Sequence, residues 1–348
     1  MTETSSLMSI DEYGKYLHGF NVIDCAVRSQ DILYLLARED YTVWPKSKWN
    51  SDNEPPPAEP HISKCLIPIM LRKQRSEVFS RGKYSGLGPA KIGTSTSPEE
   101  KCLIVTSLGQ IYATGSGSSG FEEELKSYRF ESGTRRGGIR KLRTIGGWLY
   151  ACQGNRGVIK RLGKNHWQQW HDQIDDPPDG RFGFNDIDGY SEHDIYCVGE
   201  KGDVWHYDGN SWSQIQFPSN IDLCTVCCAG DGFVYISGED GTTFKGRGQQ
   251  WERLFERDMT LPFQDMVWYQ DRVWATSDYG VWHIHQDQLM RAELPDGINA
   301  YSGHLAVADG VLMLAGYGGA AFLRDGQWTK IFSAGAMSRE WKLRQTCG

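Results

Sequence analysis

Three cysteines lie close together in the segment LCTVCCAG, at Cys224, Cys227 and Cys228. A Cys-x-x-Cys pair can bind zinc, but a strong prediction of a zinc site needs a second pair of ligands at a suitable spacing. The sequence has no such pair nearby. We therefore interpret these cysteines as small, buried residues of an innermost strand.

Two histidines, His283 and His285, alternate along a predicted strand and so point to one face of it. A carboxylate could complete a metal site there, but no partner is identifiable, and a pair of outer-strand histidines is the favoured interpretation. No G-x-S-x-G, P-loop or H-E-x-x-H motif occurs in the chain. The sequence thus predicts no catalytic residue, no metal and no cofactor.

Acidic residues gather in residues 172–194, DQIDDPPDGRFGFNDIDGYSEHD, where Arg181 is the only Lys or Arg. The eight carboxylates are Asp172, Asp175, Asp176, Asp179, Asp186, Asp188, Glu192 and Asp194. Packed carboxylates repel one another unless they meet cations, which suggests a basic partner or a metal. A calcium loop fits poorly, because aligning Gly189 with the loop glycine puts Phe184 at the first ligand position. The alternative is a solvated acidic loop.

A basic stretch precedes the acidic one, with nine Lys or Arg and no Asp or Glu between Ser132 and Trp170. Phosphate binding needs such a patch. Alternation along strands would, however, send these side chains to different faces. Neutralisation of the neighbouring acidic segment explains them adequately, and the net charge of −7 argues against general affinity for nucleic acid.

The elements that must position these residues follow from the composition. The chain of 348 residues contains 40 Gly and 13 Trp, which is typical of many turns joining many short strands. No signal peptide and no run of about 18 apolar residues is visible, so we expect no membrane span. The nine cysteines form no regular framework, which favours reduced thiols and a cytoplasmic location.

A repeat with a period of about 39 residues runs along the chain. One column contains glycines at 157, 202, 241, 280 and 319, spaced by 45, 39, 39 and 39. A second column lies just upstream, at Tyr112, Tyr150, Tyr196, Tyr235, Trp274 and Met313. A third contains a turn followed by tryptophan, at Trp167, Trp212, Trp251 and Trp328. One tryptophan per repeat is what packing between repeats requires, although stacking on sugars is the alternative.

Each repeat resolves into four short strands joined by Gly-containing turns, which is the pattern of β-propeller blades. We predict an all-β fold, a single β-propeller spanning residues 1–348 with seven blades of four antiparallel strands; six or eight blades are the alternatives. The N-terminal blade covers residues 20–80, with a fourth strand near Glu77–Ser80. Six further blades cover 101–332, starting near 101, 139, 183, 221, 262 and 300. The first 19 residues, or residues 340–345 of the tail 333–348, would supply an edge strand.

An insertion at residues 41–61, YTVWPKSKWNSDNEPPPAEPH, separates the second and third strands of the N-terminal blade. It contains Trp44 and Trp49, and tryptophan is a preferred interface anchor. The prolines would limit the entropy lost on docking. The alternative is a surface flap whose tryptophans pack back on the blade.

The blades resemble those of WD, kelch and BNR-type propellers, although no Trp-Asp dipeptide occurs and a Gly-Gly pair precedes Trp148 in one blade only. SDYGVW (277–282) and EDGTTF (239–244) resemble the Asp box of BNR proteins but fall at a different turn. A short Gly/Trp-rich propeller without an accessory domain also resembles the stand-alone bacterial immunity proteins that neutralise toxins. This second resemblance implies a cognate toxin as partner.

We therefore predict a non-enzymatic propeller that binds a protein partner on its loop-rich face and blocks it sterically and electrostatically, the partner being a toxin with a basic surface. The partner-binding residues are predicted at these positions: Trp44, Trp49, Asp175, Asp176, Asp179, Arg181, Asp186, Asp188, Glu239, Asp240, Asp278, Tyr279 and Tyr317. Two rival functions remain at this point. One is a glycan-active hydrolase, lyase or lectin that uses the central channel, and the other is a scaffold subunit of a larger complex.

Overall fold

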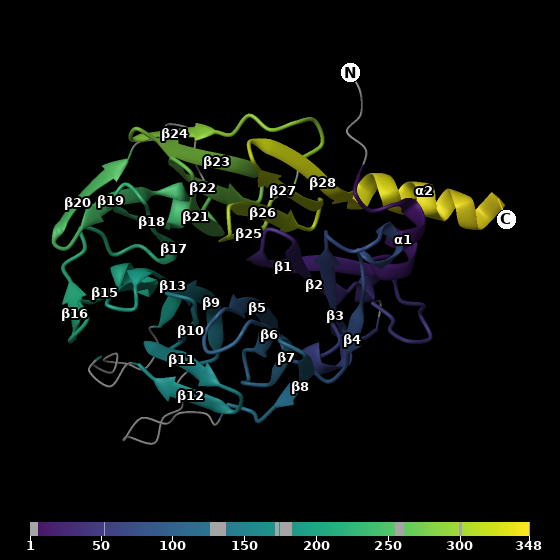
Figure 1. Cartoon of the computed structure of the whole chain (residues 1–348), viewed down its shortest axis with the longest axis horizontal. Coiled ribbons are helices and arrows are strands. Elements are labelled where there is room, and N and C mark those ends of the chain that lie inside the picture. The colour runs from purple at the N-terminus through teal and green to yellow at the C-terminus, as the bar shows by residue number, and fades with distance from the viewer. Residues whose placement is uncertain are drawn as a thin grey trace. The chain divides into compact units, whose positions relative to one another are not determined.

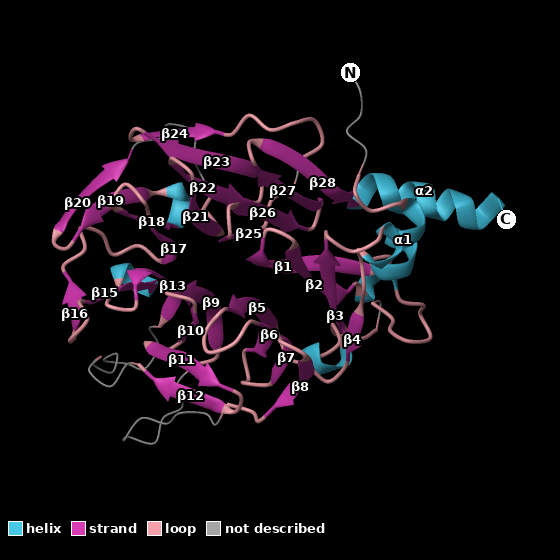
Figure 2. Cartoon of the chain, in the orientation of Figure 1, coloured by secondary structure: helices cyan, strands magenta, loops and turns pink. Residues whose placement is uncertain are grey.

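The computed structural model describes residues 6–51, 53–125, 137–170, 174, 183–254, 261–298 and 301–347. They form seven sheets, each of four antiparallel strands (Figures 1 and 2). Hydrogen bonds join the strands of every sheet in sequence order. The predicted all-β, seven-bladed propeller is confirmed.

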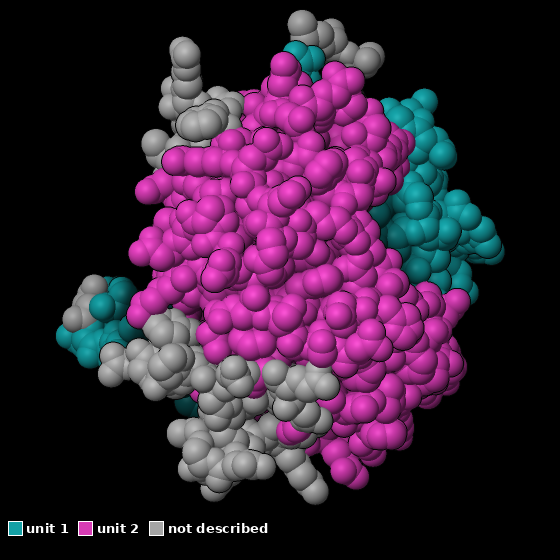
Figure 3. Space-filling view, turned by 90° about the vertical axis from the view of Figure 1, so that its left-hand side faces the viewer, with its two compact units in different colours: residues 1–89, 293–348 teal, residues 90–292 magenta. Residues whose placement is uncertain are grey.

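The chain divides into two compact units, coloured separately in Figure 3. Unit 1 comprises residues 1–89 and 293–348, and unit 2 comprises residues 90–292. No helix among the described residues has the length and apolar character needed to cross a membrane.

Unit 1 contains two blades and two helices. Its strands are β1 (Phe20–Ser29), β2 (Ile32–Glu39), β3 (Lys64–Met70), β4 (Gly82–Tyr84), β25 (His304–Ala308), β26 (Val311–Gly316), β27 (Gly319–Arg324) and β28 (Gln327–Ser333). The helices are α1 (Ile10–Tyr16) and α2 (Ala334–Cys347). One apolar core joins both blades and both helices, with Leu35, Ile67, Met313, Phe322 and Met337 among its buried residues.

One prediction for unit 1 is wrong, and of the two segments offered for the edge strand one is excluded. The fourth strand of the N-terminal blade is Gly82–Tyr84, not Glu77–Ser80, because residues 75–77 form a single 3-10 turn and only Phe79 bridges to β3. The tail forms helix α2 instead of an edge strand. Residues 7 and 8 do pair with the outermost strand β28, since their backbone N–H groups donate to the carbonyls of Lys330 and Ile331 at 2.8 and 2.9 Å.

Unit 2 contains five blades. The first two comprise β5 (Ala90–Ser95), β6 (Lys101–Thr106), β7 (Ile111–Gly115), β8 (Ser118–Glu122), β9 (Ile139–Ile145), β10 (Trp148–Gln153), β11 (Gly157–Gly163) and β12 (His166–Gln169). The next two comprise β13 (Phe184–Ser191), β14 (Asp194–Gly199), β15 (Val204–Tyr207), β16 (Trp212–Ile215), β17 (Leu223–Cys228), β18 (Val234–Gly238), β19 (Thr243–Arg247) and β20 (Gln250–Leu254). The last comprises β21 (Asp265–Tyr269), β22 (Arg272–Ser277), β23 (Gly280–His285) and β24 (Gln288–Arg291).

The blade predicted to begin near Lys101 begins eleven residues earlier, at Ala90. Lys101 instead opens the second strand, so Tyr112 lies on the third strand and its place in the second-strand column is wrong. Leu103, which pairs with Ala113, holds the position that Tyr150 holds in the next blade. The repeat is longer at this blade than in those that follow, so the alignment of the sequence did not show that its strands begin earlier.

The glycine column marks the turns between second and third strands. At Gly202, φ is +69°, and a Cβ atom would lie 1.9 Å from the carbonyl oxygen of Ser219. Only glycine tolerates both the left-handed backbone and this close approach. At this position the column glycine therefore lets the turn pack against the link that leads to the next blade.

The tryptophan column opens the fourth strands and packs between blades. Trp212 is 7% exposed, and its indole N–H donates to the carbonyl oxygen of Trp170 at 2.6 Å. Trp251 contacts Phe217, with ring centroids 5.2 Å apart. These contacts account for the repeat of the tryptophans without a role in sugar binding.

Candidate functional site

A cluster of ion pairs joins the innermost strands of unit 2. Lys141 Nζ on β9 lies 2.7 Å from Asp265 Oδ2 on β21, and Arg143 Nη2 lies 3.3 Å from Asp186 Oδ2 and 3.4 Å from Asp265 Oδ1. Asp186 also accepts hydrogen bonds from the Thr225 hydroxyl and the Val226 N–H, at 2.7 and 3.1 Å. The cluster thus ties four sheets together through the side chains of their inner strands.

Burial shapes the titration of this cluster. Burial acts to lower the pKa of Arg143, but the carboxylates of Asp186, Asp188 and Asp265 together raise it above its usual value. Burial raises the pKa of Asp188 to about 6, although Arg143 and the backbone N–H of Cys228 pull it in the opposite direction. The charged groups here satisfy one another, so this cluster is a packing feature of the blades.

Asp186 and Asp188 were predicted in an exposed acidic loop, and this placement is wrong. Both lie on strand β13, and Asp186 is 1% exposed. The predicted neutralisation by the basic stretch is confirmed for the described residues, because Arg143 pairs with these aspartates and Lys160 pairs with Glu192. Asp175, Asp176, Asp179 and Arg181 lie outside the described residues.

Two of the five turns between second and third strands in unit 2 present exposed acidic or aromatic side chains. Glu239 and Asp240 are exposed in the turn between β18 and β19, and Asp278 and Tyr279 in the turn between β22 and β23. Tyr279 is 71% exposed. The backbone at Asp240 is left-handed, with φ of 54°. Because the five blades repeat one strand order and direction, these turns share one face of unit 2.

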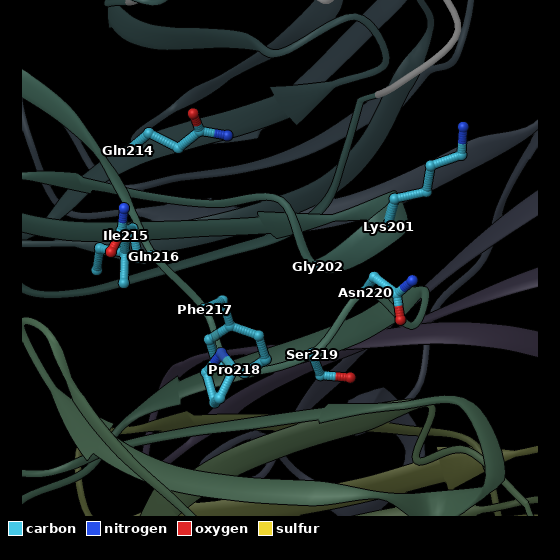
Figure 4. A pocket seen from close by; sticks show the side chains of 9 residues that line it. All are labelled: Lys201, Gly202, Gln214, Ile215, Gln216, Phe217, Pro218, Ser219 and Asn220. Atoms are coloured by element: carbon cyan, nitrogen blue, oxygen red, sulfur yellow. The ribbon is translucent and has the colours of Figure 1, made fainter.

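An open cavity lies beside one of these turns, with a volume of about 570 Å³. Its described lining residues come from the turn between β14 and β15, from β16 and from the link to β17 (Figure 4). They are Lys201, Gly202, Gln214, Ile215, Gln216, Phe217, Pro218, Ser219 and Asn220. Ile215 is buried, and Phe217 packs on Phe244 and Trp251 with centroids 4.8 and 5.2 Å apart. The apolar part of the lining is therefore fixed by the blade core.

Contacts of Asp222 hold the cavity between two neighbouring turns. The Lys201 N–H donates to Asp222 Oδ1 at 2.9 Å, and the Glu239 N–H donates to the Asp222 carbonyl at 3.0 Å. The Gly202 N–H donates to the carbonyl of Ile221 at 2.7 Å. Both turns are thereby hydrogen-bonded to the same link, which fixes the backbone positions from which their side chains project.

The insertion at 41–61 lies between β2 and β3 of unit 1 and packs partly on itself. The indole N–H of Trp44 donates to Glu39 Oε1 at 3.1 Å, and the Lys48 ammonium lies 3.2 Å from the Trp44 ring centroid. Trp49 donates to the Pro55 carbonyl at 2.9 Å, and its ring meets Tyr41 edge-on at 4.9 Å. Both tryptophans are half-buried, so the flap offers ring surface to a partner while its polar indole groups are already bonded.

Exposed apolar side chains lie within this flap and on the other blade of unit 1. Val43 is 62% exposed within the insertion. Tyr317, in the turn between β26 and β27, is 70% exposed. The structure therefore leaves Tyr317 and Tyr279 accessible, whereas Trp44 and Trp49 are partly covered.

Sequence reasoning missed Lys201 and the cavity beside it. Lys201 precedes a column glycine as Asp240 does 39 residues later, and the two residues share a left-handed backbone with φ of 57° and 54°. The repeat alignment therefore contained the signal that both side chains stand at equivalent turn positions. The described residues contain no group of three or more His, Cys, Asp or Glu that could hold a metal ion.

No protein-family model matches the chain. A curated relative does: the immune protein Tsi7 of Pseudomonas aeruginosa is 32% identical over 256 residues, which cover 72% of this chain and 83% of that protein. The chain belongs to the Tsi7 family. The resemblance to immunity propellers that the sequence suggested is thereby confirmed.

Solved structures of other propellers share the fold of this member of the Tsi7 family. Sqt1 of Saccharomyces cerevisiae aligns with a TM-score of 0.56 and 9% identity over 90% of this chain and 86% of that chain. The WD40 propeller domain of Doa1 aligns at 0.55 and 10% identity over 86% and 90%. Virginiamycin B lyase of Staphylococcus aureus aligns at 0.53 and 12% identity over 71% and 86%. At such identities the similarity to these propellers shows the fold alone. Membership of the Tsi7 family is what supports the immunity function.

Proposed function

We propose that the chain is a non-enzymatic immunity protein that neutralises a toxin by binding it through the turns between second and third strands. Membership of the Tsi7 family is the observation that carries this proposal. A propeller suits the role because rigid blades hold the binding turns in place and little entropy is lost on docking. The cytoplasmic location expected from the sequence stays a prediction.

Acidic turns favour a toxin with a basic surface. In unit 2, Glu239, Asp240 and Asp278 are exposed on the face that carries the turns between second and third strands. Their charges attract a basic partner before the two surfaces touch. Complementary charge of this kind mainly raises the association rate and selects the partner. A basic rim around the active site of a toxin is the surface that these carboxylates would meet.

Exposed aromatic side chains supply the apolar contacts. Tyr279 of unit 2 is 71% exposed, and Tyr317 of unit 1 is 70% exposed. Burial of a large exposed side chain is worth roughly 1.5–3 kcal/mol. Tyrosine is also among the residues that dominate binding energy at interfaces. Ring surface of Trp44 and Trp49 adds to these contacts in unit 1.

Co-expression tests this function. The probe is the product of the reading frame adjacent to the gene, called the adjacent-frame toxin below, induced alone and together with this chain. We expect growth arrest by the toxin alone, rescue by the chain, and a 1:1 complex by isothermal titration calorimetry. Rescue should weaken when Asp240, Asp278 and Tyr279 are changed to Lys, Lys and Ala. Persistent arrest in the presence of the folded wild-type chain, or no heat of binding, would overturn the proposal.

A further inference from the structure

The insertion between β2 and β3 of unit 1 holds one of its own cations against an aromatic ring. The Lys48 ammonium lies 3.2 Å from the centroid of the Trp44 ring and 3.3 Å from Glu39 Oε1. The indole N–H of Trp44 donates to the same carboxylate oxygen at 3.1 Å. Ring faces and carboxylates both attract cations. The ring and the carboxylate therefore form one cation-binding position, and the Lys48 ammonium marks where it is.

The carboxylate of this position is held in place and charged. The Glu39 side chain is 15% exposed, and its Oε2 accepts a hydrogen bond from the Ser63 N–H at 3.3 Å. Burial acts to raise the pKa of Glu39, but a hydrogen bond from Ser63, the charge of Lys83 and the two contacts described above together lower it below its usual value. Glu39 is therefore ionised at neutral pH and keeps a fixed position for a cation.

A second cation lies over a ring of the same insertion and is held more firmly. The Arg38 guanidinium lies 5.2 Å from the Tyr41 ring centroid, and its Nε and Nη2 lie 2.8 and 2.6 Å from Glu59 Oε1. The contact between Lys48 and its carboxylate is longer, at 3.3 Å. The Lys48 side chain is also 47% exposed, against 27% for Arg38. Of these two cations, Lys48 is the one that can exchange with a cation from outside.

We propose that this position receives an arginine side chain of the toxin, which displaces the Lys48 ammonium and takes its place on Trp44 and Glu39. This inference rests on the proposed function and deepens it. Arginine suits the position better than a second lysine, because its planar guanidinium stacks on a ring and donates two N–H groups to one carboxylate. The insertion joins a second strand to a third, so the site belongs to the set of turns that the proposed function uses.

This exchange makes the interface selective. In the free protein Lys48 covers the ring face, and a neutral side chain that displaced it would leave the Glu39 carboxylate without that cation. An arginine replaces one cation on the carboxylate by another, whereas an acidic side chain would meet a like charge. Glu39 is therefore a specificity-determining residue of the proposed interface. Lys48 is an internal competitor, which lowers the affinity for the toxin because only the fraction with the position open can bind.

Binding of the adjacent-frame toxin by surface plasmon resonance tests the exchange, on variants whose melting temperatures match the wild type. We expect Lys48→Met to tighten binding by about threefold or more, because it removes the competitor. Lys46→Met is the matched control, since it removes the same charge from an exposed residue of the same insertion, and it should stay within about twofold of the wild type. Glu39→Gln should weaken binding by about tenfold or more. Lys48→Gln replaces Lys48→Met if the latter melts below the wild type.

Double variants separate the exchange from a general effect of charge. In the Glu39→Gln background, Lys48→Met should no longer tighten binding, because the two residues act at one position. One arginine of the toxin should also couple with Glu39. Its change to Ala should weaken binding to the wild type by about tenfold, but binding to Glu39→Gln by less than about twofold.

The opposite results overturn the inference without touching the function. If the wild type binds the toxin while Glu39→Gln binds as tightly, or if Lys48→Met gains no more than Lys46→Met, no cation of the toxin enters this position. If Lys48→Met weakens binding, Lys48 itself contacts the toxin, and the exchange is overturned as well. If the folded wild type does not bind the toxin at all, the proposed function fails and the inference fails with it.

Discussion

Removal of one charge from the ion-pair cluster of unit 2 should destabilise the blades strongly. Asp265 is 1% exposed at its side chain and pairs with Lys141 at 2.7 Å and with Arg143 at 3.4 Å. Asp265→Asn keeps the volume but removes the negative charge between two buried cations. Loss of one partner of a buried ion pair costs about 3–5 kcal/mol. Arg143 retains Asp186 at 3.3 Å, so we expect the lower end, about 3 kcal/mol.

Urea unfolding followed by tryptophan fluorescence measures this change in the free energy of unfolding. Asp278→Asn is the matched control, since it makes the same substitution at an exposed turn position and should change stability by less than about 0.5 kcal/mol. A melting temperature lower by roughly 10 °C should accompany the loss in Asp265→Asn. If Asp265→Asn behaves like Asp278→Asn, the cluster does not tie the sheets together and the interpretation of these charges is wrong.

Three further predictions follow from local contacts. Burial raises the pKa of Asp188 from 3.8 to about 6, so its contribution to stability is present at low pH and is lost as pH rises through 6. Urea unfolding should therefore show that the wild type gains stability relative to Asp188→Asn, by up to roughly 3 kcal/mol, when the pH is lowered from 7 to 4. A difference in the free energy of unfolding that does not change with pH contradicts this. Gly202→Ala should cost more than about 1 kcal/mol and weaken toxin binding, because its Cβ would meet the Ser219 carbonyl, whereas Gly232→Ala, with open space around it, should cost less and leave binding unchanged. Trp44→Ala should weaken toxin binding by about tenfold while global stability changes little; equal affinity would remove the flap from the interface.

The fold could be predicted because its determinants are local and repeated. Gly202, Gly241 and Gly280 recur at fixed spacing where positive φ or close packing demands glycine, and this is visible in one sequence. The blade that begins at Ala90 was misplaced because no column glycine aligns there and the spacing stretches. Two segments stayed open for the edge strand, the first 19 residues and residues 340–345, because the sequence does not show that residues 7 and 8 pair with β28.

Some residues of the candidate site could be predicted from the sequence and others could not, because exposure depends on where a residue lies in its blade. Asp240, Asp278, Tyr279 and Tyr317 lie in turns at strand ends, where side chains are often exposed, and all four are exposed. Asp186, by contrast, lies on an inner strand and pairs with Arg143, a residue 43 positions away whose approach depends on the tertiary arrangement of the blades. Charge content alone does not distinguish a carboxylate that awaits a partner protein from one that already has its cation.

The central claim is that the toxin docks on the turns between second and third strands. Hydrogen–deuterium exchange of the chain with and without the adjacent-frame toxin tests it most directly. We predict protection on binding at residues 200–202, 239–241 and 277–280, with no change at the turns between third and fourth strands, such as residues 247–250. Protection confined to residues 247–250 and the other third-to-fourth turns would place the toxin elsewhere and contradict the account.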